Sequence, residues 1–237
     1  RLTGGILKRV LQFAPERTLP MLYKTTLKHW IGRYNRKNKG QTVGKVLLFA
    51  DEFTNYMDVE IGMKMVELLD RLGYEVVIPK HVESGRTAIS KGMLKVARKV
   101  ARKNVMLLKN IVSENVPLVG IEPSCILSFR DEYPDLVGEE LKEEAVRLGK
   151  NCLLYDEFFV REIRVGRIRA EQFTDQPLNI LLHGHCHQKS LASVEPSREM
   201  LSLPVNYKVE VIPSGCCGMA GAFGYEKKHY ELSMKIG

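Results

Sequence analysis

Cysteine is scarce in this chain, and several other features are missing beside it. The 237 residues include five cysteines and a single tryptophan. The chain has no run of about 18 apolar residues that would cross a membrane. Its basic, amphipathic start lacks the apolar segment and the cleavage site of a secretory signal. An odd number of cysteines without an export signal argues against a disulfide framework and for a reducing compartment, so we expect a cytoplasmic protein.

The chain carries a net charge of +8, but its basic residues come without a nucleic-acid signature. They concentrate in the first 45 residues and again over 91–109, with neither base-stacking aromatics nor a known binding motif. We therefore expect no nucleic-acid partner, and we interpret the charge as solvated helix faces or as a docking surface for an acidic partner. The chain begins with Arg1 and not with methionine, which indicates a fragment or a processed chain.

Short apolar runs alternate with amphipathic stretches of helical period after residue 42. We expect strands at 43–50, 74–79 and 116–123 and helices at 59–73, 89–115 and 139–149. This alternation is typical of βαβ crossovers, so the sequence predicts an α/β fold with mostly parallel sheets and helices on both faces. Residues 1–42 are interpreted as a helical lead-in or linker. Ligands of such folds bind beyond the carboxyl ends of the strands, where the unusual residues of this chain also fall.

The second half of the sequence repeats part of the first half. KVLLFADEFT (45–54) aligns with NILLHGHCHQ (179–188), and the stretch 74–92 aligns with 207–226. The alignment pairs Glu52 with Cys186, and it pairs the run Glu83-Ser84-Gly85 with Cys216-Cys217-Gly218. The repeat predicts two pseudo-symmetric modules, 43–150 and 151–237, of which only the second carries these thiols.

The thiols of the second half follow two expected strands. Cys186 comes after a run that we expect to be a buried strand, and the pair Cys216–Cys217 follows VEVIP. Neighbouring parallel strands would bring the three thiols to one sheet edge, where soft thiolates select zinc, copper or an iron–sulfur cluster. Gly215 and Gly218 let the backbone bend close to a ligand. A redox thiol pair and a structural accident remain alternatives, and zinc would take its fourth ligand from one of the histidines of HGHCH: His183, His185 or His187.

These motifs resemble a known family. The runs HGHCHQKSL, IPSGCCGMAGAFGYEKKHYELSMKIG and GIEPSCILSFRDEYPDL are similar to the CCG, or cysteine-rich, domain of heterodisulfide reductases, of the glycolate oxidase iron–sulfur protein and of lactate-utilisation proteins. They look most like the carboxyl-terminal part of fused FAD-linked D-2-hydroxyacid dehydrogenases of the D-lactate and D-2-hydroxyglutarate type. The resemblance covers roughly residues 44–237.

The resemblance implies a [4Fe-4S]-type cluster in the second module, held by Cys186, Cys216 and Cys217. A later cysteine of the family pattern is absent because the chain stops at Gly237. The first module keeps only Cys125, so the resemblance implies that it has lost its cluster. Cys125 is then a ligand of the surviving site, a substrate-site residue or an inert remnant, and we include it among the candidate metal ligands. Cys152 opens an apolar run and is expected to be a core thiol.

The resemblance also implies roles for residues beside the thiols. His185, His187, Gly215 and Gly218 would surround the ligands and tune the cluster, and Lys189 would contact an anion. No residue of this chain is expected to be catalytic, and the chain alone is expected to be inactive. Substrate would be oxidised at FAD in a missing amino-terminal portion. Electrons would then pass through the cluster to a quinone or another carrier.

The expected partners are the rest of a fused flavoprotein chain or a flavoprotein subunit, together with the electron acceptor. A peripheral position at the inner face of the membrane stays open. Two other function classes also stay open. One is a zinc-binding or metal-free module that docks partners without redox activity. The other is a thiol reductase that uses Cys216 and Cys217, which needs an exposed sulfur of lowered pKa.

Overall fold

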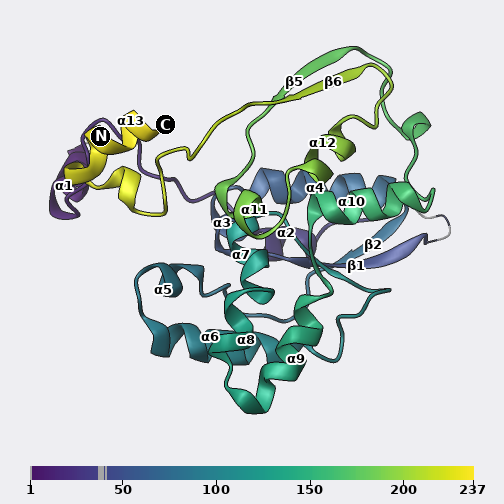
Figure 1. Ribbon diagram of the computed structural model, residues 1–237, viewed down its shortest axis with the longest axis horizontal. Coiled ribbons are helices and arrows are strands. Elements are labelled where there is room, and N and C mark those ends of the chain that lie inside the picture. Colours follow the sequence, from purple (N-terminus) through teal and green to yellow (C-terminus); the bar gives the residue numbers. More distant parts are fainter. Residues whose placement is uncertain (1, 37–39, 41) are drawn as a thin grey trace.

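Two parallel β-sheets organise the chain, as Figure 1 shows for the computed structural model. The structure describes residues 2–36, 40 and 42–237. The first sheet has the strand order β2-β1-β3-β4, and the second consists of β5 and β6. The strands are β1 Gly44–Phe49, β2 Tyr74–Val77, β3 Leu118–Gly120, β4 Cys152–Leu154, β5 Leu178–Leu182 and β6 Tyr207–Val211. All pairings are parallel, which confirms the predicted α/β class.

Helices cover both faces of the first sheet. The longer ones are α4 Val59–Arg71, α6 Leu94–Leu108, α9 Glu139–Gly149 and α10 Tyr155–Arg164. Alternate residues of β1 point to opposite faces: Leu47 packs in the core beneath α6 and α9, and Val46 packs in the core beneath α4 and α10. This two-sided burial explains why β1 reads as a continuous apolar run.

The predicted helices agree with the structure except between β2 and β3. The helix expected at 139–149 is α9. The helix expected at 59–73 is α4, which ends at Arg71, two residues before Gly73 adopts a left-handed φ of +93°. The single helix expected over 89–115 is wrong. The structure has a short helix α5, Arg86–Ser90, and a separate α6 that ends at Leu108. Gly92 separates them because its left-handed backbone, φ +69°, cannot continue a right-handed helix.

The second sheet is more exposed than the sequence predicts. We expected Cys186 to follow a buried strand, but Leu181 of β5 is 69% exposed and no residue of the strand is fully buried. The prediction fails because β5 pairs only with β6 within the described residues, so it lacks the two-sided cover that β1 has. Two short helices lie between these strands, α11 Cys186–Leu191 and α12 Glu195–Leu201.

The two strand pairs β1–β2 and β5–β6 show the pseudo-symmetry of the repeat. Gly44 pairs with Tyr74, and Leu178 pairs with Tyr207, at the equivalent positions of the alignment. The glycines that follow the second strand of each pair also match, because Gly85 has φ +75° and Gly218 has φ +74°. The backbone therefore repeats along with the sequence, although the module boundaries themselves stay predictions.

The first residues of the chain pack in two places. The helix α2, Leu27–Ile31, buries Leu27 completely against the first sheet. The helix α1, Leu2–Val10, lies instead beside the carboxyl-terminal residues, so that both ends of the chain share one lobe (Figure 1). That lobe also contains η3 Phe223–Tyr225, η4 Lys227–His229 and α13 Tyr230–Ile236. The predicted boundary near residue 42 adjoins positions 37–39 and 41, which lie outside the described residues.

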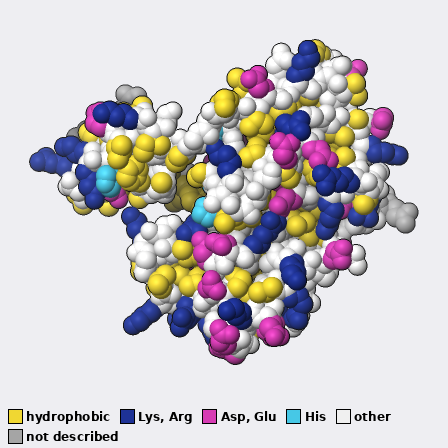
Figure 2. All heavy atoms as spheres, viewed as in Figure 1, with side chains coloured by type: hydrophobic (Ala, Val, Ile, Leu, Met, Phe, Trp, Pro, Cys, Tyr) yellow, Lys and Arg dark blue, Asp and Glu magenta, His cyan; other side chains and the backbone are white. Residues whose placement is uncertain are grey.

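The surface carries mixed charge. On the visible face, Lys and Arg side chains are interspersed with Asp and Glu, and apolar side chains gather on the lobe at the left (Figure 2). Exposed apolar residues of that lobe include Ile6, Val10, Leu232 and Met234. No helix in the described part of the chain is long and apolar enough to cross a membrane.

Candidate functional site

The site lies where the strands of both sheets end. In the first sheet, the order β2-β1-β3 places the reversal of strand order between β1 and β3. Ligands of open α/β sheets bind at such a reversal, outside the carboxyl ends of the strands. Asp51 and Glu52 follow β1, Ser84 follows β2, and Cys125 follows β3. Of these, Glu52 and Ser84 are the first-half counterparts of Cys186 and Cys217.

Three of these side chains meet in a hydrogen-bonded triad, Glu52–Ser84–Cys125. The backbone amide and the hydroxyl of Ser84 donate to the carboxylate of Glu52, at 2.9 and 2.6 Å. Ser84 is also a hydrogen-bond partner of the Cys125 thiol. In the repeat, Glu52 and Ser84 correspond to Cys186 and Cys217. The positions equivalent to two of the thiols therefore touch each other in the first half.

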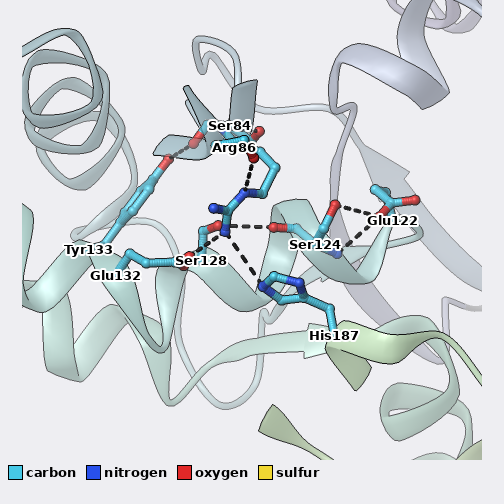
Figure 3. A network of polar contacts seen from close by, with 9 residues as sticks. Ser84, Arg86, Glu122, Ser124, Ser128, Glu132, Tyr133 and His187 are labelled. Carbon is cyan, nitrogen blue, oxygen red and sulfur yellow. Dashed lines mark hydrogen bonds and ion pairs between the residues drawn. The ribbon is translucent and has the colours of Figure 1, made fainter. Parts of the chain in front are cut away.

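Buried groups support this triad from two sides. Asp51 is fully buried and accepts from the amides of Phe53 and Thr54, which caps the short helix α3, Glu52–Tyr56. The hydroxyl of the buried Tyr133 donates to the Ser84 carbonyl oxygen at 2.8 Å, as Figure 3 shows. The cap fixes the start of α3, where Glu52 lies, and Tyr133 fixes the loop of Ser84.

Cys125 is a poor candidate for a thiolate ligand. Cys125 lies in the short helix α7, Pro123–Ile126, and none of its surface is exposed. Burial raises the pKa of the Cys125 thiol, and the negative charges of Asp51 and Glu52 act in the same direction. The neutral thiol is therefore favoured, whereas a metal ligand is a thiolate. The placement of Cys152 as a fully buried core thiol is confirmed.

The thiols of the second half are accessible. Cys186 and Cys217 are exposed, and Cys216 is half-buried. Cys186 begins α11, directly after the strand β5 has ended at Leu182. The sulfur of Cys216 accepts a hydrogen bond from the backbone amide of Gly218 at 3.4 Å.

Lys189 joins the two thiol-bearing segments. Its amine donates to the carbonyl oxygens of Ser214 and Gly215, at 2.9 and 2.7 Å. Lys189 lies one helical turn after Cys186, and Gly215 directly precedes Cys216. The bridge places α11 beside the loop of the thiol pair. The resemblance implied that Lys189 contacts an anion. In the structure its amine instead binds backbone carbonyl oxygens of the loop.

The histidines that flank Cys186 reach to the first half. Nε2 of His185 lies 3.7 Å from Oε1 of Glu122. Nε2 of His187 lies 3.5 Å from Nη1 of Arg86, as Figure 3 shows. Arg86 in turn forms an ion pair with Glu132. Burial lowers the pKa of His185, and Glu122 opposes this effect. Cys186 therefore sits at the contact between the halves.

A buried network fixes α11 to the core. The amide of Gln188, two residues after Cys186, donates to Asp156 of α10 at 2.6 Å and to Ser197 of α12 at 3.0 Å. Ser197 also hydrogen-bonds Asp156. The helix α10 packs on the first sheet through Phe158. The network therefore fixes α11, which contains Cys186, relative to the first sheet.

The donor chemistry of the second half fits an iron–sulfur cluster, but the structure holds no preformed set of ligands. Cys186, Cys216 and Cys217 are soft donors at the ends of two paired strands, accessible to metal. Among residues 2–36, 40 and 42–237, however, no three His, Cys, Asp or Glu side chains are grouped closely enough to hold a metal ion. The structure brings the two thiol-bearing segments together through Lys189 without grouping three such side chains.

Several residues of the site were not identified from the sequence. Asp156 and Arg86 lie in none of the quoted motifs, and although Gln188 and Glu122 do, nothing in the sequence indicated which residues they would contact. Arg17 of the lead-in was not identified either, although it donates to Ser233, which in turn hydrogen-bonds Gly218 after the thiol pair. The repeat, which aligns Ser84 with Cys217, bears on the contact between Glu52 and Ser84 but on none of the contacts named here.

Fold and site together define an α/β protein with paired parallel sheets and cysteines after the strands of the second sheet. The sequence matches no protein-family model and no solved structure. Lactate utilization protein A of Bacillus subtilis (strain 168) is 30% identical over 186 residues, which cover 76% of this chain and 74% of that protein. The chain therefore belongs to the lactate utilization protein A family.

Two other relatives are named for dehydrogenases. D-2-hydroxyglutarate dehydrogenase of Escherichia coli (strain K12) is 30% identical over 203 residues, which cover 84% of this chain and 19% of the enzyme. A subunit of the anaerobic glycerol-3-phosphate dehydrogenase from the same organism is 26% identical over 234 residues, covering 98% of this chain and 57% of that subunit. The chain thus spans about a fifth of the length of the D-2-hydroxyglutarate dehydrogenases that it matches. These relatives place it among redox-related modules.

Proposed function

We propose that this chain is the electron-transfer module of a flavin-dependent 2-hydroxyacid oxidoreductase and that its second half is a CCG domain. Cys186, Cys216 and Cys217 would hold a [4Fe-4S]-type cluster, which when bound accepts and releases single electrons. The 2-hydroxyacid is proposed because relatives carry the names D-2-hydroxyglutarate dehydrogenase and lactate utilization protein A.

One observation carries the proposal: in the first half, the counterparts of Cys186 and Cys217 touch. The hydroxyl of Ser84 lies 2.6 Å from the carboxylate of Glu52, at the end of a strand pair with the same topology. A backbone of this form can therefore bring the two positions within reach of one ligand. The matching φ angles of Gly85 and Gly218 support the same geometry around the thiol pair.

The chain's own residues would position and shield the ligands. Lys189 holds the loop of the thiol pair against α11, and Gln188 holds α11 against α10. His185 and His187 lie on either side of Cys186 in the sequence and would set its surroundings. Cys125 as a further ligand stays a prediction, which its neutral, buried surroundings do not favour.

FAD and the substrate site would lie outside this chain, in a further part of the same polypeptide or in a flavoprotein subunit. The support is the small share of the dehydrogenase relatives that the chain covers. Electrons would leave to a quinone or another carrier.

Anaerobic reconstitution with iron and sulfide tests the proposal. We expect brown protein with bound iron and sulfide, and we expect Cys186→Ser, Cys216→Ser and Cys217→Ser each to reduce the iron content. Cys152→Ala is the matched control, because Cys152 is a core thiol that should leave iron binding intact. Cys125→Ser decides the prediction of a fourth ligand.

Two results would overturn the proposal. Tight binding of zinc with no iron in the reconstituted protein would favour the zinc-binding docking module. The second result is colourless protein that binds neither iron nor zinc while the buried thiols of Cys125 and Cys152 stay unreactive toward alkylation, which shows that the protein is folded. This result would favour the metal-free docking module.

A further inference from the structure

The beginning of the chain clasps the carboxyl-terminal segment that carries the thiol pair. We call residues 12–17 the strap. Phe13 forms an isolated antiparallel bridge with Glu226. On either side of this bridge, the amide of Ala14 donates to the carbonyl oxygen of Tyr225 at 2.8 Å, and the amide of Lys227 donates to the carbonyl oxygen of Gln12 at 2.8 Å. Ala14 is fully buried in this contact. The strap thus adds backbone pairing to a segment more than 200 positions away.

Arg17 extends the strap toward the thiols. Its Nε donates to the carbonyl oxygen of Gly224 at 2.8 Å, and its Nη2 donates to the hydroxyl of Ser233 at 2.9 Å. The guanidinium also lies over the ring of Tyr230, 5.1 Å from the centroid. Arginine suits this role because its planar fork offers several donors in fixed directions.

Ser233, which binds Arg17, also binds Gly218, the residue that follows the thiol pair. Its hydroxyl donates to the carbonyl oxygen of Gly218 at 2.8 Å, and Ser233 is only 1% exposed. A Cβ on Gly218 would lie 2.2 Å from the Ser233 carbonyl oxygen, so the two backbones are in close contact. The chain of contacts therefore runs from Arg17 through Ser233 to Gly218, which directly follows Cys217.

We infer that Arg17 is a positioning residue for the Cys216–Cys217 pair and that the strap fixes the conformation of this loop. Lys189 holds the loop from the side of α11, and Arg17 holds it from the opposite end of the sequence. Without the strap, the glycine-rich loop would lose a fixed point next to Cys217. The consequence for metal binding rests on the proposed function, whereas the consequence for the thiols themselves does not.

Thiol alkylation measures the positioning directly. The folded, reduced protein would be treated with iodoacetamide, and modification of the peptide with Cys216 and Cys217 would be followed by mass spectrometry relative to that with Cys186. In Arg17→Ala we expect this ratio to rise by about three- to tenfold, the effect of losing one or two hydrogen bonds. The matched control is Arg9→Ala, since Arg9 is an exposed arginine of the same lead-in.

Cys186 and the buried thiols distinguish positioning from general destabilisation. A merely structural role would raise the reactivity of all thiols, including Cys125 and Cys152. A positioning role raises that of the pair alone. Arg17→Lys keeps the charge and one donor and should give an intermediate ratio. Ser233→Ala should raise the alkylation ratio as much as Arg17→Ala does. The double variant should give no higher ratio than either single variant, because both changes break the same chain of contacts.

An unchanged ratio in both Arg17→Ala and Ser233→Ala would overturn the inference. If Arg17→Ala exposes Cys125 and Cys152, the ratios of Arg17→Lys and Ser233→Ala decide instead. The iron content after reconstitution separates the two proposals. Wild-type protein that binds no iron refutes the proposed function and leaves the alkylation ratio valid. Loss of iron from Arg17→Ala but not from Arg9→Ala would link the strap to the cluster.

Discussion

The amide of Gln188 donates to the carboxylate of Asp156 at 2.6 Å, in a buried contact between α11 and α10. Gln188 lies two residues after Cys186, and Asp156 lies on a helix that packs against the first sheet. Burial raises the pKa of Asp156, and the hydrogen bonds from Ser197 and Gln188 oppose that effect. The position of the exposed thiol thus depends on a polar pair that is itself hidden from solvent.

Replacing Gln188 should destabilise the protein and loosen the helix of Cys186. Gln188→Ala leaves Asp156 buried with one donor fewer, which costs about 1–3 kcal/mol of unfolding free energy. Urea unfolding gives this loss, and hydrogen exchange should show faster exchange in α11. Gln176→Ala, at an exposed position, is the control and should change neither measurement. Equal stability of the two variants would contradict the role assigned to Gln188.

Lys189→Met should loosen the loop of the thiol pair without unfolding the protein. The lysine holds two loop carbonyl oxygens in an exposed setting, so its loss should cost only about 0.5–1.5 kcal/mol locally. Amides of residues 214–218 should exchange a few times faster. Lys208→Met, on the exposed side of β6, is the matched control. Identical exchange in both variants would show that the bridge does not order the loop.

The stability of the protein should fall in acid partly through His81. This residue is 8% exposed, packs on Phe49 with ring centroids 4.5 Å apart, and leaves Nε2 without a partner. Burial lowers the pKa of His81 to about 4. A lowered histidine pKa contributes stability above the unfolded value, and this stability is lost as the pH falls toward the folded value. The unfolded chain takes up the proton first.

His81→Phe keeps an aromatic ring against Phe49 and removes the titration. Between about pH 7 and about pH 4.5, the wild type should lose about 2 kcal/mol more unfolding free energy than the variant. Burial raises the pKa of Asp51 to about 6, which acts in the opposite direction, but Asp51 is common to both proteins. Denaturant unfolding at the two pH values measures the difference. Parallel pH profiles would contradict this assignment.

The first half should accept a metal once cysteines replace Glu52 and Ser84. Glu52 and Ser84 touch each other, and Ser84 touches Cys125. The double variant Glu52→Cys/Ser84→Cys would therefore place three thiols together, a donor set that binds cobalt(II) and zinc. Cobalt(II) should give a thiolate charge-transfer absorption in the double variant and not in Glu52→Cys alone. A folded double variant without this absorption would show that the three positions do not converge in solution.

Local patterns account for much of the fold. The apolar run before Asp51 became the buried strand β1, the stretch 139–149 became α9, and Cys152 entered the core, as predicted. Each depends on the sequence period of its own segment. The break at Gly92 and the exposure of β5 were not predicted, because one depends on a single backbone angle and the other on which neighbours a strand finds.

By itself, the sequence determined the parallel α/β class, the internal repeat and the positions of the three thiols in the second half. These follow from the order and chemistry of residues that are close in the chain. Tertiary structure alone decided that Glu52 meets Ser84, that Gln188 meets Asp156, and that Arg17 reaches the segment after Cys217. Such contacts join distant residues, and their pairing depends on how sheets and helices pack, which no local pattern of hydrophobicity or charge encodes.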